Sequence, residues 1–419
     1  GIPLRRSRPN CKIKMSFCLM SPDLLRVGEH TPFALRDQTG CLLMPSGVYI
    51  ATEAQRQLMI SRPLYIADNE AAQVKRALAG AVDTMVRRND RLGLASQAQH
   101  DASGILGNTS ASMPCRRLED PAGTWASFVL RTAALLRDAG QEDFLRKCLR
   151  LQSQLAELVT GHADDALLTL VHTAANDFRD YSAAHATLVC VVCELAARHL
   201  TGWAADMRTA LRCAALTMNV GMTALQNQLA TQHGAPTELQ RAIIARHGAD
   251  GAAVMRANGV CDALWLTAVE HHHDTSSGPL ADLPAALQVA RLIRRADIFA
   301  ARLSPRKARA AMSGCSAAKA AFLGDDGRPD DAGSAIVKAI GICPPGSLVR
   351  LSCGEVAVVL RQGRRANEPV VASVLSTAGT PLAVPALRET RRKPYDVVSG
   401  VAPQEVKLLL NVGSLLKLA

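Results

Sequence analysis

The run Ala214-Ala-Leu-Thr-Met-Asn-Val-Gly221 decides the fold prediction and raises the main question about the chemistry of this chain. Met218 follows Leu211 and Ala215 at helical spacing, so it shares the apolar face of a predicted helix. The same pattern continues over 126–340, which we therefore expect to be almost wholly helical. Small aliphatic residues dominate the chain and aromatic residues make up 3% of it, which favours closely packed helices.

Polar residues that could bind a metal lie on the interior stripes of these predicted helices. A single histidine on an apolar face is more often a core residue, but a buried carboxylate is costly unless it is paired or bound to a cation. Several such residues on separate helices are better explained by convergence on one polar cavity than by accidental burial. Imidazole and carboxylate ligands suit iron, manganese or zinc. The residues concerned are His185, His247, His271, His272 and Asp297.

Length, charge and hydropathy exclude several classes of protein. A chain of 419 residues can form two or three domains with a sizeable core. The net charge of +11 is spread along the chain without interleaved aromatic residues, so we expect no specific nucleic-acid binding. No apolar run approaches the roughly 18–20 residues that span a bilayer, and we expect no membrane span. No secretory signal is visible.

The twelve cysteines do not have the regular spacing of a disulfide framework. Cys190 and Cys193 form a C-x-x-C, but it lies within a predicted helix and has no second C-x-x-C to complete a zinc site. We interpret these two cysteines as core residues and the chain as a cytoplasmic protein with reduced thiols.

Changes in pattern along the chain predict its organisation. A mainly α fold should combine one large helical domain with two small β-rich parts. Turn signals separate short strands in the N-terminal module, and alternating β-branched residues mark the C-terminal barrel or sheet. The predicted parts are a disordered basic leader or upstream extension (1–19), a β-rich module (20–75), a helical then flexible linker (76–125), the helical domain (126–340) and the β extension (341–419).

At these residues the chain resembles the HD-GYP family of HD-superfamily metal-dependent phosphohydrolases, from about residue 165 to its end. Ala214–Met222 is similar to the family's A-A-L-L-H-D-I-G-K segment, and His247 with Gly251 to its H-x-x-x-G step. The segment 269–279 looks like a shortened H-H-E-x-x-D-G-S-G-Y-P, and 296–301 resembles A-D-x-x-D-A-L.

The resemblance implies a helical HD-type domain and a part in cyclic-di-GMP signalling. Members of the family hydrolyse a phosphodiester of the cyclic dinucleotide with divalent metal ions, here iron or manganese. The residues matching metal ligands are His185, His247, His271, His272 and Asp297. Arg306 and Arg309 match positions that face the phosphates, where a guanidinium can make a bidentate contact.

The chain departs from the family at the centre of this chemistry. Met218 and Asn219 replace the His-Asp pair, so a soft thioether and a neutral amide stand where a ligand and a bridging carboxylate are expected. Met222 replaces a lysine, His273 replaces the glutamate after the paired histidines, and the loop lacks its tyrosine. If each missing group stabilised the transition state by ~3–4 kcal/mol, even a partial loss would cost several decades in rate.

Three functions remain open. The preferred one is a catalytically impaired HD-GYP-like protein that acts by binding cyclic-di-GMP or a related nucleotide, or a partner protein. The alternative is an active metal-dependent phosphodiesterase with a remodelled, mononuclear site, and the third is a regulatory protein with an empty relic of the cavity. We expect the N-terminal module to act in sensing or dimerisation, so a homodimer and a signalling protein are candidate partners.

Overall fold

The structure, a computed structural model, describes residues 17–19, 25, 27–28, 30–31, 34–37, 41–60, 64–67, 118, 120–176, 179–324, 326–363, 365, 367–406, 408 and 410–419. The chain divides into two compact units, Gly1–Cys115 and Arg116–Ala419. Most of the predicted leader (1–19) and most of the predicted linker (76–125) lie outside the described residues. A strand lies inside that leader at 17–19, however, and a helix begins inside that linker at Pro121.

The first unit contains a small antiparallel sheet, as the sequence pattern predicts. Its strand order is β1-β4-β2-β3, and the helix α1 (Glu53–Ile60) lies between the third and fourth strands along the chain. A compact apolar cluster that includes Leu35, Ile50 and Ile66 forms its core. The strands are β1 (Phe17–Leu19), β2 (Leu35–Arg36), β3 (Leu42–Met44) and β4 (Tyr65–Ala67).

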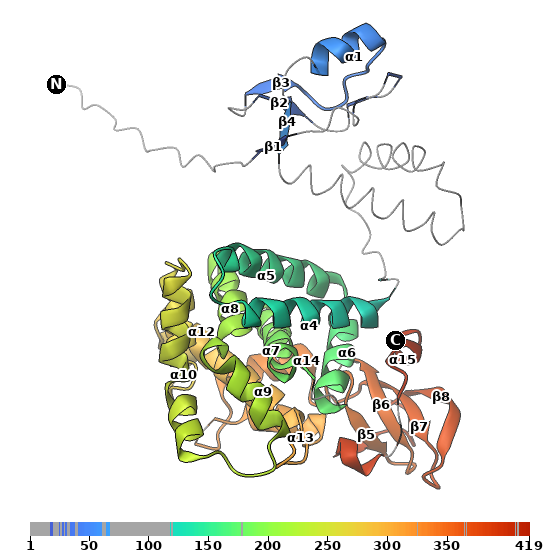
Figure 1. Ribbon diagram of the computed structural model, residues 1–419. Helices are drawn as coiled ribbons and strands as arrows, with labels where there is room; N and C mark the ends of the chain where they lie inside the picture. The colour runs from blue at the N-terminus through green and yellow to red at the C-terminus, as the bar shows by residue number, and fades with distance from the viewer. Residues whose placement is uncertain are drawn as a thin grey trace, which may run out of the picture. The chain divides into compact units, whose positions relative to one another are not determined.

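The second unit is mainly α, in agreement with the prediction (Figure 1). One large apolar core joins its helices, and buried alanines allow the helices to approach closely. The helices are α4 (Pro121–Arg137), α5 (Phe144–Gly161), α6 (Ala163–Asn176), α7 (Tyr181–Ala197), α8 (Ala205–Thr217), α9 (Thr223–Thr231), α10 (Glu238–Ala257), α11 (Ala263–His271), α12 (Ala285–Leu303), α13 (Gly314–Phe322) and α14 (Asp331–Ile340).

Helix α7 is the centre of this unit. All of its residues from Tyr181 to Ala197 are buried, because the helix is apolar around its whole circumference. It packs against α4, α6, α8, α12 and α14. A polar side chain on α7 is therefore enclosed by neighbouring helices whichever way it points.

Local capping residues set where several helices begin. The Asp120 side chain accepts a hydrogen bond from the amide of Gly123, and Pro121 occupies the first turn of α4, where its missing N–H costs nothing. Thr237 and Gln240 form a capping box at the start of α10. Asp262 caps α11 through the amide of Trp265. These caps explain why the long periodic stretch is divided into separate helices.

A five-stranded antiparallel sheet ends the chain, in the order β8-β7-β6-β5-β9. It packs against the helical part through a core that includes Leu168 of α6, and the helix α15 (Val412–Leu416) contacts both α6 and α4. Gly341, which ends α14, has the left-handed φ of 81° that glycine tolerates. The strands are β5 (Leu348–Leu351), β6 (Val356–Arg361), β7 (Val370–Leu375), β8 (Pro381–Glu389) and β9 (Val397–Val401).

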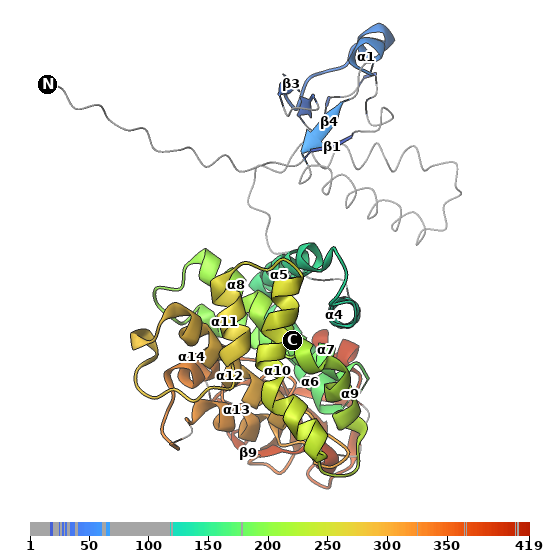
Figure 2. The same cartoon turned by 60° about the vertical axis from the view of Figure 1, so that its left-hand side comes forward.

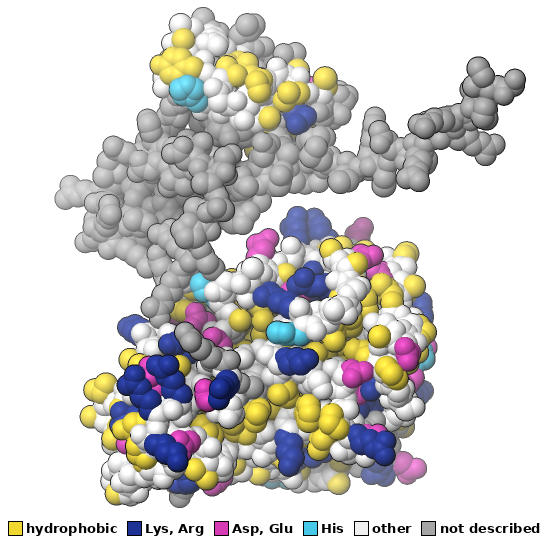
Figure 3. Space-filling view, turned by 180° about the vertical axis from the view of Figure 1, so that it is seen from behind, with side chains coloured by type: hydrophobic (Ala, Val, Ile, Leu, Met, Phe, Trp, Pro, Cys, Tyr) yellow, Lys and Arg dark blue, Asp and Glu magenta, His cyan; other side chains and the backbone are white. Residues whose placement is uncertain are grey.

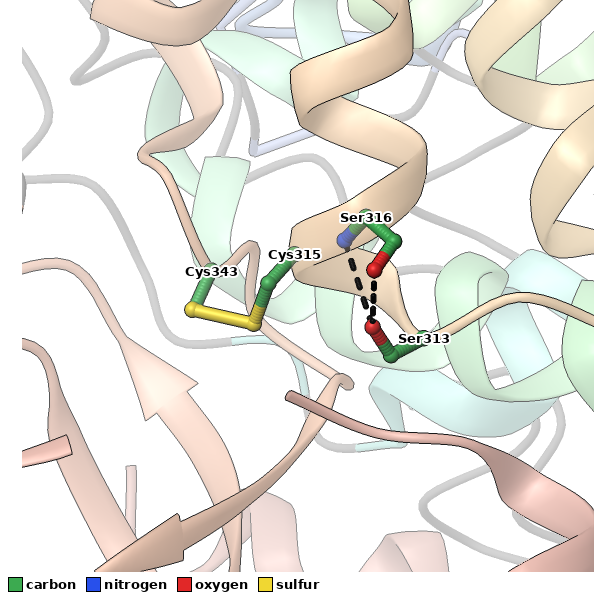
Figure 4. The surroundings of a disulfide bond; sticks show 4 residues. All are labelled: Ser313, Cys315, Ser316 and Cys343. Atoms are coloured by element: carbon green, nitrogen blue, oxygen red, sulfur yellow. Dashed lines mark hydrogen bonds between the residues drawn. A yellow bond between two sulfur atoms is a disulfide. The ribbon is translucent and has the colours of Figure 1, made fainter. Parts of the chain in front are cut away.

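The prediction of unpaired thiols is wrong at one pair of cysteines. A disulfide joins Cys315, in the first turn of α13, to Cys343, in the loop before β5, with Cα atoms 4.4 Å apart (Figure 4). The two cysteines are 28 residues apart, so sequence spacing could not pair them. Cys190 and Cys193 are fully buried in α7 and unpaired, consistent with a core role.

Two surface expectations can be compared with the described residues. None of the helices described in the structure is both long enough and apolar enough to cross a membrane. On the face of the second unit in Figure 3, Lys and Arg side chains are interspersed with acidic and apolar ones. The positive charge on that face therefore does not form one continuous stripe.

Candidate metal site

Three imidazoles converge between α10 and the loop after α11. The Nε2 atom of His247 lies 3.1 Å from Nε2 of His272 and 3.2 Å from Nε2 of His273. His247 donates its Nδ1–H to the carbonyl of Ile244 at 2.6 Å, and His272 donates its Nδ1–H to that of Val269 at 2.7 Å. These bonds leave Nε2 unprotonated in the neutral rings, so that lone pairs face one another.

Glycine in α10 makes this convergence possible. A Cβ atom on Gly248 would lie 2.7 Å from the carbonyl oxygen of Glu270 in α11, closer than any side chain allows. Gly251 also faces Val269, where a Cβ would be 3.3 Å from its side chain. The two helices therefore approach at glycine positions next to His247. Figure 2 shows α10, α11 and α12 side by side.

The environment favours neutral rings. Burial, with the nearby His273 and His247, lowers the pKa of His272 to about 3, although Asp297 and the bond to Val269 oppose this shift. Burial also lowers the pKa of His273, again against the attraction of Asp297. Neutral imidazole is the form that binds metal.

A second polar pair lies beside the three histidines, between α7 and α12. The Nε2 atom of His185 is 2.7 Å from Oδ1 of Asp297. Burial alone would raise the pKa of Asp297, but the hydrogen bond from His185 and the charges of His185, His272 and His273 outweigh it, so this pKa lies below its usual value. The Nδ1 atom of His185 is buried and has no hydrogen-bond partner among the described residues.

Met218 and Asn219 follow directly after α8. The Met218 side chain is fully buried, and Asn219 is 7% exposed. The Oδ1 atom of Asn219 has no hydrogen-bond partner in the described part of the chain. Gly221 holds this segment against α10, because a Cβ there would be 2.5 Å from the carbonyl oxygen of His247. The segment therefore lies against α10 at His247.

The two arginines predicted to bind phosphate have different surroundings. The Arg306 guanidinium lies over the Tyr181 ring, with Cζ 5.5 Å from the ring centroid. The Arg309 guanidinium instead donates to the carbonyls of Ala301 and, at 3.3 Å, Ser304, which are at the C-terminal end of α12. Arg306 is therefore placed near His185, whereas Arg309 caps a helix end.

The structure differs from the sequence prediction at the run of three histidines. His271 is not part of the cluster: its side chain is 39% exposed, and its Nδ1 atom lies 2.7 Å from Oδ2 of Asp274. His273 lies in the cluster, in the place that the sequence pattern predicted for His271. Helix α11 ends at His271, so the helical period used in the prediction does not continue through His272 and His273. The only sequence signal for His273 was its position in the run.

This donor set fits a divalent cation. The ligand atoms of His247, His272 and His273 all lie within 4.8 Å of one another. Three imidazole nitrogens suit a borderline cation such as zinc or iron, and Asp297 adds a carboxylate charge nearby. His185 and Asp297 are bonded to each other, so they form a second group rather than part of this cluster.

The helices enclose three converging histidines beside the His185–Asp297 pair, and a helical domain with this donor set could hold a metal ion. A curated relative, the cyclic di-GMP phosphodiesterase PA4108 of Pseudomonas aeruginosa, is 25% identical over 319 residues, covering 72% of this chain and 75% of the relative. A solved structure, Bd1817, an HDG"Y"P protein from Bdellovibrio bacteriovorus, covers 77% of this chain and 99% of its own, with a TM-score of 0.41 and 14% identity. No family model matches the chain. The similarity to this phosphodiesterase bears out the resemblance to the HD-GYP family.

Proposed function

We propose that this protein binds cyclic di-GMP at the site formed by the three histidines, the His185–Asp297 pair and Arg306, and that its hydrolytic activity is impaired. The observation that carries the proposal is the convergence of the Nε2 atoms of His247, His272 and His273. The similarity to the phosphodiesterase PA4108 supports the choice of ligand.

The residues of the site have complementary parts in binding. His247, His272 and His273 would hold a divalent cation, iron or manganese. When bound, such a cation polarises a phosphoryl oxygen and lowers the pKa of a coordinated water. Arg306 offers a guanidinium fork to a phosphate, and the ionised Asp297 keeps His185 oriented through their hydrogen bond.

Met218 and Asn219 account for the impaired hydrolysis. A buried thioether is a weak ligand for a hard or borderline cation, and a neutral amide cannot bridge two cations as a carboxylate does. The Asp297 carboxylate is already engaged with His185. A second cation therefore lacks the ligands that would hold it beside the first, and in-line stabilisation of the attacking and leaving oxygens is weakened.

An active phosphodiesterase with a remodelled site is the second candidate. It is favoured by Oδ1 of Asn219, a buried oxygen without a hydrogen-bond partner among the described residues. That atom and His273, which is not a ligand of the predicted set, offer replacement donors for a mononuclear centre. In this case the single cation would be sufficient for hydrolysis.

Binding and hydrolysis should be measured together on the full chain. Isothermal titration with cyclic di-GMP, at a fixed concentration of Fe²⁺ or Mn²⁺, gives the affinity, and chromatography of the same mixture detects linear product. Binding without product supports the proposal. Product formation supports the second candidate, and absence of both binding and product overturns both in favour of an empty relic.

The wider organisation follows from the same proposal. The N-terminal module (20–75) acts in sensing or dimerisation, so a homodimer and a signalling protein partner are part of the proposed function. The helical domain (126–340) carries the nucleotide site, and the C-terminal sheet (341–419) packs against that domain. We also propose a cytoplasmic location, where a cyclic dinucleotide would be encountered.

A further inference from the structure

We propose that Tyr181 is a positioning residue that holds the Arg306 guanidinium beside the His185–Asp297 pair, and that Arg309 stabilises this arrangement without contacting the nucleotide. The inference rests on the proposed function and names the phosphate-binding group of that site. It assigns different parts to two arginines that motif similarity treats as equivalent.

The Tyr181 ring contacts both His185 and Arg306. Its ring is stacked on His185, one helical turn later in α7, with centroids 5.9 Å apart and planes at 12°. The Arg306 Cζ atom lies 5.5 Å from the same ring centroid. Tyr181 is 3% exposed and Arg306 is partly buried, so this contact is partly shielded from water and is stronger than a fully exposed contact of the same kind.

The tyrosine hydroxyl contributes less than the ring. The Arg306 Nε–H donates to the Tyr181 hydroxyl at 3.4 Å, longer than the usual range for a strong hydrogen bond. Stacking and the cation–π contact therefore carry most of the interaction. This difference separates the effect of removing the hydroxyl from the effect of removing the ring.

The backbone fixes Tyr181 at the start of α7. Asp180, directly before it, has a left-handed φ of 47°, which is uncommon for a residue other than glycine but tolerated by aspartate. The amide of Ser182 donates to Oδ1 of Asn227 in α9 at 2.9 Å. The first turn of α7 is therefore held from both sides, and the ring cannot easily turn away from His185.

A tight backbone pair fixes the loop that carries Arg306. The amide of Arg306 donates to the carbonyl of Arg309 at 2.8 Å, and the amide of Arg309 donates to the carbonyl of Arg306 at 2.8 Å. The Lys307 amide donates to the Ala230 carbonyl of α9 at 3.0 Å. With its guanidinium on the α12 end carbonyls, Arg309 anchors the loop, whereas the Arg306 guanidinium lies over Tyr181.

The test compares four variants of the full chain by isothermal titration, with cyclic di-GMP and inorganic pyrophosphate as separate probes. Tyr181→Phe should bind within about twofold of the natural chain, because the ring is kept. Tyr181→Leu and Arg306→Lys should each weaken binding by about tenfold. The double variant Tyr181→Leu/Arg306→Lys should be no weaker than either single variant, because either change removes the planar guanidinium held on the ring.

Two controls accompany these variants. Arg302→Lys changes an exposed arginine near the C-terminal end of α12 and should leave binding unchanged. Bound metal, measured by mass spectrometry, should be the same in all variants, because none of them alters the three histidines. If Tyr181→Leu does not fold, unchanged binding by Arg306→Lys still overturns the inference, since that variant keeps the charge and loses the flat cation.

The outcomes separate this inference from the proposed function. Unchanged binding by Arg306→Lys or Tyr181→Leu, or additive losses in the double variant, would overturn the positioning role of Tyr181. If pyrophosphate follows the expected pattern while cyclic di-GMP does not bind, the positioning role stands and the proposed ligand is wrong. If neither probe binds to the natural chain, both are wrong.

Discussion

Nε2 of His247 lies 3.1 Å from Nε2 of His272, while each ring donates its Nδ1–H to a main-chain carbonyl. With both rings neutral, two lone pairs face each other inside the protein, an arrangement that requires a shared proton or a cation. Burial lowers the pKa of His272 to about 3, which disfavours a second proton on that ring at neutral pH. A metal cation would satisfy the lone pairs of both rings, and this relationship gives the first prediction.

We expect the natural chain to bind one Fe²⁺ or Mn²⁺ per chain, with ligands that include His273 but not His271. Replacement of His273 by alanine should weaken metal binding by on the order of 10–100-fold, at least the effect of altering an outer-sphere partner. His271→Ala is the matched control, because its ring faces Asp274. Metal analysis after dialysis checks this, and equal losses in the two variants would contradict it.

Restoring the family's pair should raise hydrolysis. In the double variant Met218→His/Asn219→Asp, an imidazole and a bridging carboxylate return to the segment beside α10, so a second cation gains ligands. We expect the rate of cyclic di-GMP hydrolysis to rise by roughly two orders of magnitude or more, as one recovered transition-state contact implies. Product is measured by chromatography at equal metal content. An unchanged or lower rate would show that the pair does not limit the reaction.

Gly248→Ala should separate α10 from α11. The added Cβ would meet the Glu270 carbonyl at 2.7 Å, so the helix must move, with an expected loss of about 1–3 kcal/mol in the free energy of unfolding. Metal affinity should fall as well, because His247 moves with α10. Gly234→Ala is the control, since nothing lies within 4 Å of its Cβ position. Denaturant unfolding measures the stability of both variants, and equal stability of the two would argue against the close approach.

The C-terminal sheet should lose stability in acid through Glu355. A hydrogen bond from Arg388, assisted by one from Ser373, lowers the pKa of Glu355. The stability contributed by this ionised group is present above the unfolded pKa of about 4.3 and disappears as pH falls through the lower folded value. Glu355→Gln should therefore destabilise at pH 7 and cost little near pH 3. Thermal unfolding at both pH values tests this, and a deficit independent of pH would be inconsistent with it.

Periodicity predicted the helical fold because a 3.6-residue repeat depends only on neighbours along the chain. The change to alternating β-branched residues after Ile340 likewise marks where α14 ends. The same argument was weaker for His185. Helix α7 is buried on every side, so any polar residue on it would have appeared to face the interior. Its partner Asp297 lies 112 residues later and became evident only in the folded chain.

The chain's residue types and order determined that helices form, that imidazoles and a carboxylate enter the interior, and that Met218 and Asn219 stand beside them. Only the tertiary structure decided which imidazoles meet. Helix α11 ends at His271, so the next two residues turn by loop geometry, which brings His273 to His247 and leaves His271 with Asp274. It also directed Arg309 to the end of α12 and joined Cys315 to Cys343. These contacts depend on how separate helices pack, which local sequence preferences do not specify.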